Sequence, residues 1–411
     1  MTRERSRANK RRYLIPLAAV LVLALFFAAR ALLRRPQEQV RATLTLAGTV
    51  GGTDTIGYRR AVGPHAFSFP RDHGPHPGFR TEWWYFTGDL EDASGRRFGY
   101  QFTIFRSALH PPDSATARDT SGNARSDWRA DDMYMAHFTV TDAKEGHFIA
   151  RDRFARAALG LAGAQAQPLR VWLEDWRVES TGESAFPVRL VAFADSIAID
   201  LVLDQGKPVV LNGVNGLSQK SAAPGNASYY YALTRMPTRG TVTIAGRSAK
   251  VSGFSWLDRE WSTSALAPGV VGWDWFSIQL SDDTELMVYR LRRADGSTDP
   301  FSGGTFISKT GEPIILSAED IVLEQRSAWR SPLDGTMYPA RWRIAVPHLG
   351  IRLETEPVLP DQELNVAVRY WEGAIVARGT SHGQAVTGRG YMELTGYGPE
   401  GAAAAEAPRR Q

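Results

Sequence analysis

Two strand-like stretches stand out, Gly253-Phe-Ser-Trp-Leu-Asp-Arg-Glu-Trp261 and Gly272-Trp-Asp-Trp-Phe-Ser-Ile-Gln-Leu280. Alternate residues of a strand point to the same face. Asp258 and Glu260 can therefore share a face, and so can Trp273 and Trp275. Carboxyl groups among indole rings lie in a low-dielectric setting that favours their protonated form. Such a site suits acid chemistry on an apolar substrate, although the core of an aromatic-rich barrel would have the same composition.

The second stretch has two largely non-polar faces. One face carries Trp273, Trp275, Ser277 and Gln279, and the other carries Asp274, Phe276, Ile278 and Leu280. A strand of a simple sandwich buries one face and exposes the other to water. Two non-polar faces indicate that one lines a cavity, as in a lipocalin-like barrel, or that the strand lies between two domains.

The rest of the chain favours an all-β fold. Short runs rich in Val, Ile, Thr and aromatic residues alternate with Gly, Pro, Asp and Ser, which is the pattern of strands and turns. Convincing helical periodicity is confined to residues 318–325, where one short helix is expected. Strands at this spacing with few helices are typical of antiparallel barrels or sandwiches.

The length of the chain predicts two β domains. About 340 residues lie between a polar N-terminal stalk and a low-complexity tail, which is more than one hydrophobic core usually supports. The expected segments are a basic stub with a membrane segment at 1–35, a linker at 36–60, an N-terminal lipocalin-like domain at 61–245, a C-terminal lipocalin-like domain at 246–398 and a disordered tail at 399–411.

The N-terminal segment predicts export. Residues 1–12 are strongly basic, and residues 13–29 form an uncharged, mostly apolar run at the short limit for a membrane span. Ala29-Arg30-Ala31 is a poor cleavage site, so we expect an uncleaved anchor rather than a cleaved signal peptide. Both alternatives place the bulk of the chain on the periplasmic or extracytoplasmic side. A membrane transporter as partner is left open.

Charge and cysteine content exclude several classes of function. The formal net charge is +4, but the basic residues are concentrated in 1–35, so the exported part is mildly acidic. No nucleic-acid partner is therefore expected. The chain has no cysteine, which excludes disulfides, thiol nucleophiles, and zinc or iron–sulfur sites with cysteine ligands.

No metal and no cofactor are expected. His73 and His76 flank a short stretch beside Asp72, and two histidines with an acid can ligate a metal. Gly74, Pro75 and Pro77 make this segment an irregular loop, and no third ligand is evident. The sequence therefore favours a loop that covers a barrel mouth.

Several longer motifs resemble one known family. The segment Phe69-Pro-Arg-Asp-His-Gly-Pro-His-Pro-Gly-Phe-Arg-Thr-Glu-Trp-Trp-Tyr-Phe-Thr-Gly-Asp-Leu90 is similar to the opening signature of the AttH/CrtC-like family. Further matches follow in order: Gly216-Leu-Ser-Gln-Lys220, Ala227-Ser-Tyr-Tyr-Tyr-Ala-Leu-Thr-Arg235, Trp256-Leu-Asp-Arg-Glu-Trp261, Gly272-Trp-Asp-Trp-Phe276 and Gly390-Tyr-Met-Glu-Leu-Thr-Gly-Tyr397. The resemblance covers about residues 60 to 398.

The resemblance implies a fold and a reaction class. The family includes carotenoid 1,2-hydratases, also called hydroxyneurosporene synthases, and many proteins named predicted secreted hydrolases. It implies two lipocalin-like barrels in tandem and a hydro-lyase that adds water to an isolated double bond. Fungal relatives of similar architecture are pericyclases, so the fold does not fix the function. A serine-type hydrolase is not expected, because Gly253-Phe-Ser255 continues with Trp256 and Leu257 and forms no nucleophile elbow.

Hydration of an unactivated alkene needs a strong acid and a wall that tolerates a carbocation. Asp258 and Glu260 are the candidate acids, and aromatic faces stabilise a cation by about 0.5–2 kcal/mol each. The candidate wall consists of Trp256, Trp261, Trp273 and Trp275. The alternative is that Asp258, Arg259 and Glu260 form a structural salt-bridge cluster at a domain interface. Paired carboxylates with tryptophans also fit a glycosidase.

Three further residues are substrate-binding candidates: Glu82, Trp84 and His137. A buried Glu82 must pair with an arginine such as Arg106 or Arg235, or line the same cavity. His137 is either a catalytic or a buried, hydrogen-bonded histidine. Two functions fit all these residues, a hydratase for an apolar polyene or terpenoid and a membrane-tethered carrier of a lipid or other hydrophobic small molecule.

Overall fold

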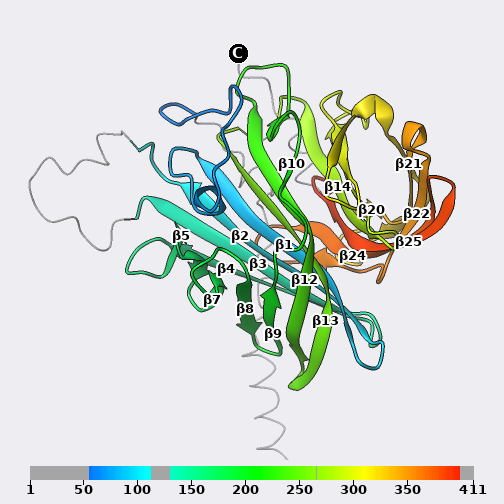
Figure 1. Ribbon diagram of the computed structural model, residues 1–411, viewed down its shortest axis with the longest axis horizontal. Helices are drawn as coiled ribbons and strands as arrows, with labels where there is room; N and C mark the ends of the chain where they lie inside the picture. The colour runs from blue at the N-terminus through cyan, green and yellow to red at the C-terminus, as the bar shows by residue number, and fades with distance from the viewer. Residues whose placement is uncertain (1–54, 113–129, 265, 399–411) are drawn as a thin grey trace, which may run out of the picture. The chain divides into compact units, whose positions relative to one another are not determined.

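The computed structural model describes residues 55–112, 130–264 and 266–398. Within these ranges the chain forms two curled antiparallel sheets and one two-stranded ribbon (Figure 1). No α-helix occurs among the described residues. The helical elements there are the 3-10 turns η1 (Arg71–His73), η2 (Ala318–Asp320) and η3 (Pro347–Leu349). The all-β prediction is confirmed.

The first sheet has 13 strands in the order β4-β3-β2-β1-β13-β12-β9-β8-β7-β6-β5, with β10 and β11 also paired to β12. The strands are β1 (Thr81–Asp92), β2 (Arg97–Ala108), β3 (Asp132–Asp142), β4 (His147–Arg156), β5 (Ala162–Ala166), β6 (Leu169–Leu173), β7 (Trp176–Ser180), β8 (Val188–Ala194), β9 (Ile197–Leu203), β10 (Val210–Leu211), β11 (Leu217–Gln219), β12 (Ala227–Ile244) and β13 (Arg247–Ser262).

The second sheet has 10 strands in the order β17-β16-β15-β14-β25-β24-β22-β21-β18, with β23 paired to β24, and β19 and β20 form the ribbon. The strands are β14 (Val270–Leu280), β15 (Glu285–Arg293), β16 (Gly303–Ile307), β17 (Pro313–Ser317), β18 (Val322–Gln325), β19 (Ala328–Arg330), β20 (Met337–Pro339), β21 (Trp342–Val346), β22 (Ile351–Pro357), β23 (Glu363–Leu364), β24 (Tyr370–Ser381) and β25 (Gln384–Leu394).

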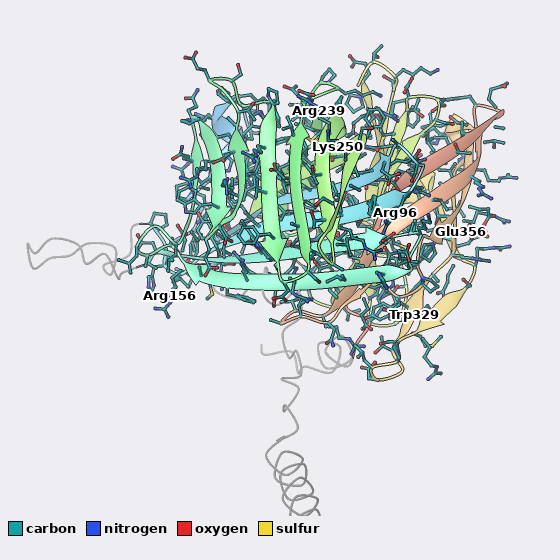
Figure 2. All side chains as sticks on the ribbon, turned by 90° about the horizontal axis from the view of Figure 1, so that it is seen from below. Arg96, Arg156, Arg239, Lys250, Trp329 and Glu356 are labelled. Atoms are coloured by element: carbon teal, nitrogen blue, oxygen red, sulfur yellow. The ribbon has the colours of Figure 1, made fainter. Side chains whose placement is uncertain are left out.

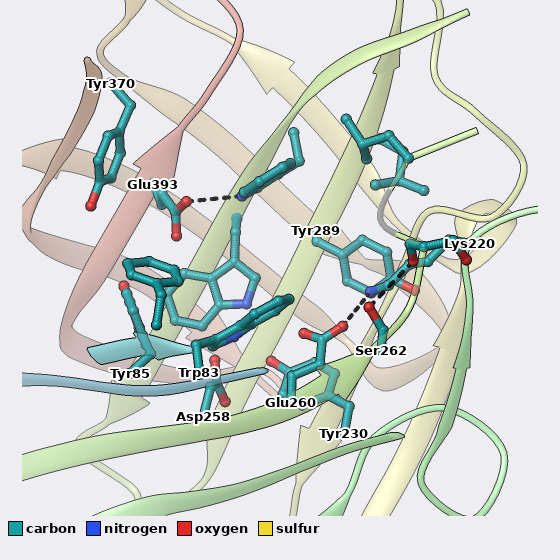
Figure 3. Close-up of a pocket in the computed structure, with 16 residues that line it drawn as sticks. Trp83, Tyr85, Lys220, Tyr230, Asp258, Glu260, Ser262, Tyr289, Tyr370 and Glu393 are labelled. Carbon is teal, nitrogen blue, oxygen red and sulfur yellow. Dashed lines mark hydrogen bonds and ion pairs between the residues drawn. The ribbon is translucent and has the colours of Figure 1, made fainter. Parts of the chain in front are cut away.

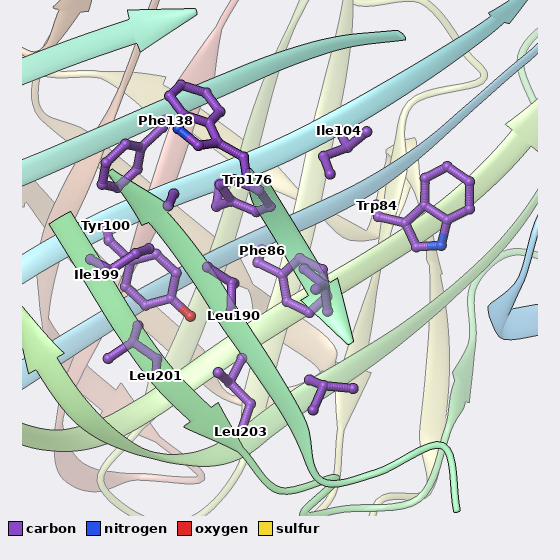
Figure 4. Close-up of a cluster of buried hydrophobic side chains, with 14 of the residues drawn as sticks. Trp84, Phe86, Tyr100, Ile104, Phe138, Trp176, Leu190, Ile199, Leu201 and Leu203 are labelled. Carbon is purple, nitrogen blue, oxygen red and sulfur yellow. The ribbon is translucent and has the colours of Figure 1, made fainter. Parts of the chain in front are cut away.

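Each sheet curls around its own apolar core. In the first sheet, buried and more exposed residues alternate along β8 and β9, so one face of these strands enters the core. Phe86, Tyr100 and Trp176 are among the large side chains buried there (Figure 4). In the second sheet, Phe276 and Trp342 lie in the core. Arg156, Arg239 and Lys250 are exposed on the outside of the first sheet (Figure 2).

A third cluster of buried side chains joins the outer faces of the two sheets. It includes Tyr85, Tyr230 and Trp256 from the first sheet and Trp275 and Tyr391 from the second. The central strands β1, β13 and β14 are therefore buried on both faces over much of their length. This explains the two non-polar faces of residues 272–280, because Phe276 and Ile278 enter the core of the second sheet while Trp275 meets the first sheet.

Two expectations from the sequence are corrected. The change of sheet lies between Ser262 and Val270 rather than at residue 246, because β13 pairs with both β1 and β12 and completes the first sheet. The helix expected at 318–325 is a single 3-10 turn followed by β18. Asp320 accepts hydrogen bonds from the backbone and hydroxyl of Ser317 at 2.8 and 2.7 Å, which closes that turn. The next residues then pair with β21.

The predicted membrane segment at 1–35, most of the predicted linker at 36–60 and the predicted tail at 399–411 lie outside the described residues. In the part of the chain that is described, no helix has the length and apolar character needed to cross a membrane.

Candidate active site

Strand register gathers the first wall of the site on the outer face of the first sheet. Trp83 lies opposite Glu260, and Tyr85 lies opposite Asp258, across the β1–β13 ladder. Tyr230 of β12 lies opposite Glu260 from the other side. Residues directly opposite each other in an antiparallel pair share a face. The expected shared face of Asp258 and Glu260 is therefore confirmed, and three aromatic side chains surround the two carboxyls.

The second wall comes from the second sheet. Trp275 of β14 lies opposite Tyr289 of β15 and Glu393 of β25. Trp273, two residues earlier, lies opposite Leu291. The expected shared face of Trp273 and Trp275 is thus confirmed as well.

A pocket lies between these two walls (Figure 3). The centre of a water molecule can move in about 110 Å³ of it. One water needs about 10–15 Å³ on that scale, so the pocket takes a small ligand or one end of a longer one. Its apolar and aromatic lining is Trp83, Tyr85, Phe105, Tyr230, Leu266, Trp273, Trp275, Tyr289, Leu291 and Tyr370. Its remaining lining is Lys220, Asp258, Glu260, Ser262, Ser264 and Glu393.

Asp258 is a buried carboxyl group with neutral hydrogen-bond donors. Trp256 Nε1 donates to its Oδ1 at 2.8 Å, and the Tyr230 hydroxyl also donates to it. Burial raises the pKa of Asp258 to about 8 and outweighs these two hydrogen bonds, which lower it. Asp258 is therefore largely protonated at neutral pH and presents an acid to the pocket.

Glu393 and Glu372 form a second group of buried carboxyls. They lie opposite each other on β25 and β24. Trp273 Nε1 donates to Glu393 at 3.1 Å, and the Tyr85 hydroxyl donates to Glu372. Burial raises the pKa of Glu372 to about 8, and burial together with the charge of Glu372 raises the pKa of Glu393. Two neighbouring buried carboxyls resist ionising together, so this pair retains at least one proton at neutral pH.

Glu260 differs from these acids because a lysine pairs with it. Lys220 Nζ lies 3.2 Å from Glu260 Oε1, and the Ser228 hydroxyl donates to the same oxygen. Burial alone would lower the pKa of Lys220, but the charge of Glu260 outweighs it and the pKa of Lys220 is raised. The pocket therefore holds the Lys220–Glu260 ion pair and two carboxyls whose pKa burial raises, Asp258 and Glu393.

The structure separates the predicted site residues into two faces. Asp258, Glu260, Trp273 and Trp275 line the pocket. Trp256 lies behind the wall, where it holds Asp258 and contacts Trp275 with ring centres 6.4 Å apart. The prediction that Trp256 belongs to the wall is therefore corrected: Trp256 positions the carboxyl of Asp258.

Trp261, Trp84 and Glu82 are not in the pocket, which corrects their assignment to the substrate site. Neighbouring residues of a strand point to opposite faces, so Trp261 cannot share a face with Glu260. Trp261 instead stacks on His76, with ring centres 3.7 Å apart. Trp84 lies in the core of the first sheet, where the Arg259 guanidinium lies 3.9 Å from its ring centre.

Glu82 is the centre of a buried ion-pair network on the same inner face. Of the alternatives that the sequence left open, it pairs with Arg106 and not with Arg235, and its second partner is Arg259. The two arginines hold the pKa of Glu82 well below its usual range although burial opposes them. Arg259 therefore points away from Asp258 and Glu260, and the alternative of a salt-bridge cluster of these three residues is wrong.

His137 is a buried histidine outside the pocket lining. Its Nδ1 lies 2.8 Å from the Tyr370 hydroxyl, and its ring packs on Phe105 with centres 5.5 Å apart. Burial lowers the pKa of His137 to about 3, so it is neutral at neutral pH. It supports two residues of the pocket wall from behind, and its assignment to substrate binding is corrected to this supporting position.

The structure adds pocket residues that sequence reasoning missed. Glu393, Lys220 and Tyr230 line the pocket. Glu393 had a signal, because it is a lone acid in the otherwise uncharged run Tyr391–Leu394. Lys220 follows β11 in a connecting segment, where no periodicity predicts which way a side chain points.

The histidine loop brings together a different set of residues from the pair considered in the sequence. Ligand atoms of His65, Asp72 and His76 lie within 4.8 Å of one another. His73 instead bonds to the Tyr231 hydroxyl at 2.6 Å. Asp72 already accepts hydrogen bonds from His65 and the Ser68 backbone, and Arg259 Nη2 lies 3.2 Å from His76 Nδ1. This cationic neighbour disfavours a metal ion, and the absence of a metal stays a prediction.

Comparison with known proteins identifies relatives of this chain. The family model described as AttH-like matches residues 60–397. A kievitone hydratase of Fusarium solani subsp. phaseoli is 26% identical over 246 residues, which cover 57% of this chain and 68% of that protein.

Two solved structures share the fold. The crystal structure of an AttH protein from Nitrosomonas europaea has a TM-score of 0.72 and 31% identity, and the match covers 83% of this chain and 100% of that one. The crystal structure of kievitone hydratase from Nectria haematococca has a TM-score of 0.59 and 15% identity, with 82% of this chain and 96% of that one covered. At that identity the second likeness concerns the fold alone.

Proposed function

Since this chain belongs to the AttH-like family, we propose that it is a hydratase that adds water to a double bond of an apolar polyene or terpenoid substrate. The observation that carries the proposal is the buried carboxyl of Asp258, which faces an aromatic-lined pocket and whose pKa burial raises to about 8. Kinship with a kievitone hydratase supports this reaction class. Asp258 is the proposed catalytic acid, and the two curled sheets act as tandem lipocalin-like barrels that enclose the site.

The reaction follows from the groups that face the pocket. Asp258 transfers its proton to one alkene carbon, so that a carbon–hydrogen bond forms and the other carbon becomes a carbocation. The rings of Trp83, Trp273 and Trp275 line the space beside that carbon and stabilise the cation by about 0.5–2 kcal/mol for each contact. Water bonds to the cation and returns one proton to the Asp258 carboxylate. The sum is addition of one water, and the acid is restored.

The pH dependence follows from the acid's role. The pKa of Asp258 is raised to about 8 from 3.8, so activity requires the form present below that pH. We expect kcat/KM to fall by about tenfold for each pH unit above about 8. Activity that rises from pH 6 to 9 in a pH–rate profile would contradict the assignment of Asp258 as the acid.

The same shift affects stability. A carboxyl whose folded pKa is raised contributes stability fully below its unfolded pKa and loses it as pH rises through the folded value. The stability that the protonated Asp258 contributes is therefore lost as pH rises from about 4 to about 8.

The cellular setting remains a proposal from the sequence. Residues 13–29 anchor the chain in a membrane and place the β-sheets on the periplasmic or extracytoplasmic side.

The family match begins at residue 60, so removal of residues 1–35 should leave a soluble, folded β-protein. Far-ultraviolet circular dichroism checks this, and a spectrum dominated by helix or an insoluble product would contradict it.

A membrane-tethered carrier of a hydrophobic ligand is the second candidate function. The mostly aromatic lining of the pocket favours it, since a carrier needs an apolar wall and a mouth but no acid. An enzyme needs at least one carboxyl within reach of the ligand. Asp258, Glu260 and Glu393 all line the pocket, which supports the hydratase over the carrier.

A further inference from the structure

The pocket has one charged end that the proposed reaction does not use. Lys220 and Glu260 form an ion pair there with nitrogen and oxygen 3.2 Å apart, and their side chains are only 14% and 8% exposed. Ser262 and Ser264 line the same pocket, and Figure 3 shows Ser262 beside Lys220 and Glu260. Lys220 is the one cationic residue among the described residues that line the pocket.

This ion pair does not serve to join the two sheets. Lys220 lies in the segment that directly follows β11, and Glu260 lies in β13, so the pair links two parts of the chain on the side of the first sheet. A different lysine makes the connection between sheets, because Lys207 lies 2.9 Å from Glu285 of β15. Removing two charges from water is costly, and a buried pair is weak evidence for stability. The position of the Lys220–Glu260 pair at the pocket wall therefore points to a ligand.

The chemistry of the pair selects the kind of group that fits. Lys220 is a donor that also lies over the ring of Tyr289, 5.1 Å from its centre. Glu260 is a hydrogen-bond acceptor. Its Oε1 already accepts a hydrogen bond from the Ser228 hydroxyl and pairs with Lys220, which leaves Oε2 for a further donor. The pair is electrically neutral overall. A group that both accepts and donates a hydrogen bond satisfies both partners. An anion is repelled by the charge of Glu260, and an ether oxygen cannot donate a hydrogen bond to Glu260.

We propose that Lys220 and Glu260 bind a hydroxyl group of the substrate, which makes the substrate an alkene that also carries an alcohol or phenol. This inference rests on the proposed function, because it assigns the alkene to the aromatic part of the pocket beside Asp258. The hydroxyl accepts a hydrogen bond from Lys220 and donates one to Glu260. The charged end thereby fixes which double bond of the substrate lies at the acid.

Calorimetric titration of the full-length protein with three probes tests the inference. The probes are geraniol, its methyl ether and geranate, which share an alkene chain and differ in the oxygen group. Hydrogen bonds to charged groups are strong enough that geraniol should bind about 10- to 100-fold more tightly than the ether. Geranate should also bind more weakly than geraniol.

Variants of the two lysines separate binding from folding. Lys220→Met should reduce the preference for geraniol over the ether to less than about threefold, and Lys220→Arg should retain most of it. Lys207→Met is the matched control, because it removes a lysine that is similarly little exposed from an ion pair outside the pocket, and it should leave the preference unchanged. If Lys220→Met does not fold, the double variant Lys220→Met with Glu260→Gln removes both charges together and should lose the preference.

The outcomes distinguish this inference from the proposed function. Equal binding of geraniol and its ether, or tighter binding of geranate, overturns the hydroxyl assignment and leaves the hydratase proposal standing. Failure of all three probes to bind overturns both. A geraniol preference that Lys220→Met abolishes supports the inference, even if geraniol is not turned over.

Discussion

We expect Asp258→Asn to lower the proposed hydration rate by about 10²–10⁴-fold, the range that a positioned general acid supplies, and to leave the fold intact. Asparagine has nearly the same shape, and its oxygen still accepts the hydrogen bond that Trp256 Nε1 makes to Asp258 at 2.8 Å. What it lacks is the acidic proton that the buried carboxyl presents to the pocket. Rate measurements, thermal melts and titrations with an apolar ligand check the three parts of this prediction.

Glu260→Gln is the comparison for Asp258→Asn, because it changes a second pocket carboxyl to its amide without removing the proposed acid. Both carboxyls lie on one face of β13, but Glu260 is paired with Lys220, so it is not the proton donor. We expect Glu260→Gln to reduce activity less than Asp258→Asn does. A sharp loss of stability in Asp258→Asn without a specific loss of activity would show that Asp258 is structural.

Glu82→Gln destabilises the protein by about 3–5 kcal/mol, as expected when one partner of a buried ion pair is removed. Glu82 is fully buried between Arg106 and Arg259. The neutral amide leaves both guanidinium groups without their shared charge. Arg106 then keeps its ion pair with Asp132, in which nitrogen and oxygen are 2.6 Å apart. Chemical denaturation of the variant and the parent measures the difference.

Asp200→Asn is the control for Glu82→Gln, because it removes one carboxylate from an exposed ion pair. Asp200 pairs with Arg189 at 2.6 Å in the same sheet, but both side chains are about half exposed. Exposed pairs contribute about 0–1 kcal/mol, so this variant should unfold almost like the parent. Equal effects of Glu82→Gln and Asp200→Asn would contradict the structural role given to Glu82. Because the pKa of Glu82 is depressed, the stability that Glu82 contributes to the fold should be lost as pH falls.

The sequence predicted what depends on the two-residue period of a strand. Asp258 and Glu260 had to share a face, as did Trp273 and Trp275, and the structure confirms both pairs in one pocket. The same period places Trp261, which follows Glu260 directly, on the inner face, where it stacks on His76. The all-β class was also predictable, because strand and turn residues alternate along residues 61–398.

The rest of the site depends on which strands become neighbours. Glu393 reaches the pocket because β25 pairs with β14, and no local pattern in the sequence encodes that pairing. Arg259 is next to Asp258 and Glu260 in the sequence, but its ion-pair partner Glu82 comes from β1. The predicted boundary at residue 246 falls in the turn between Ile244 and Arg247, which joins two strands of one sheet.

The protonation state of Asp258 tests the central claim most directly, and it needs no substrate. Infrared difference spectroscopy detects the carbonyl band of a protonated carboxyl group, and comparison with Asp258→Asn assigns the band to this residue. The account predicts a band that is present at neutral pH, disappears with a midpoint near pH 8 and is missing from the variant. A parent protein whose Asp258 is already ionised at pH 5 to 6 would contradict the account.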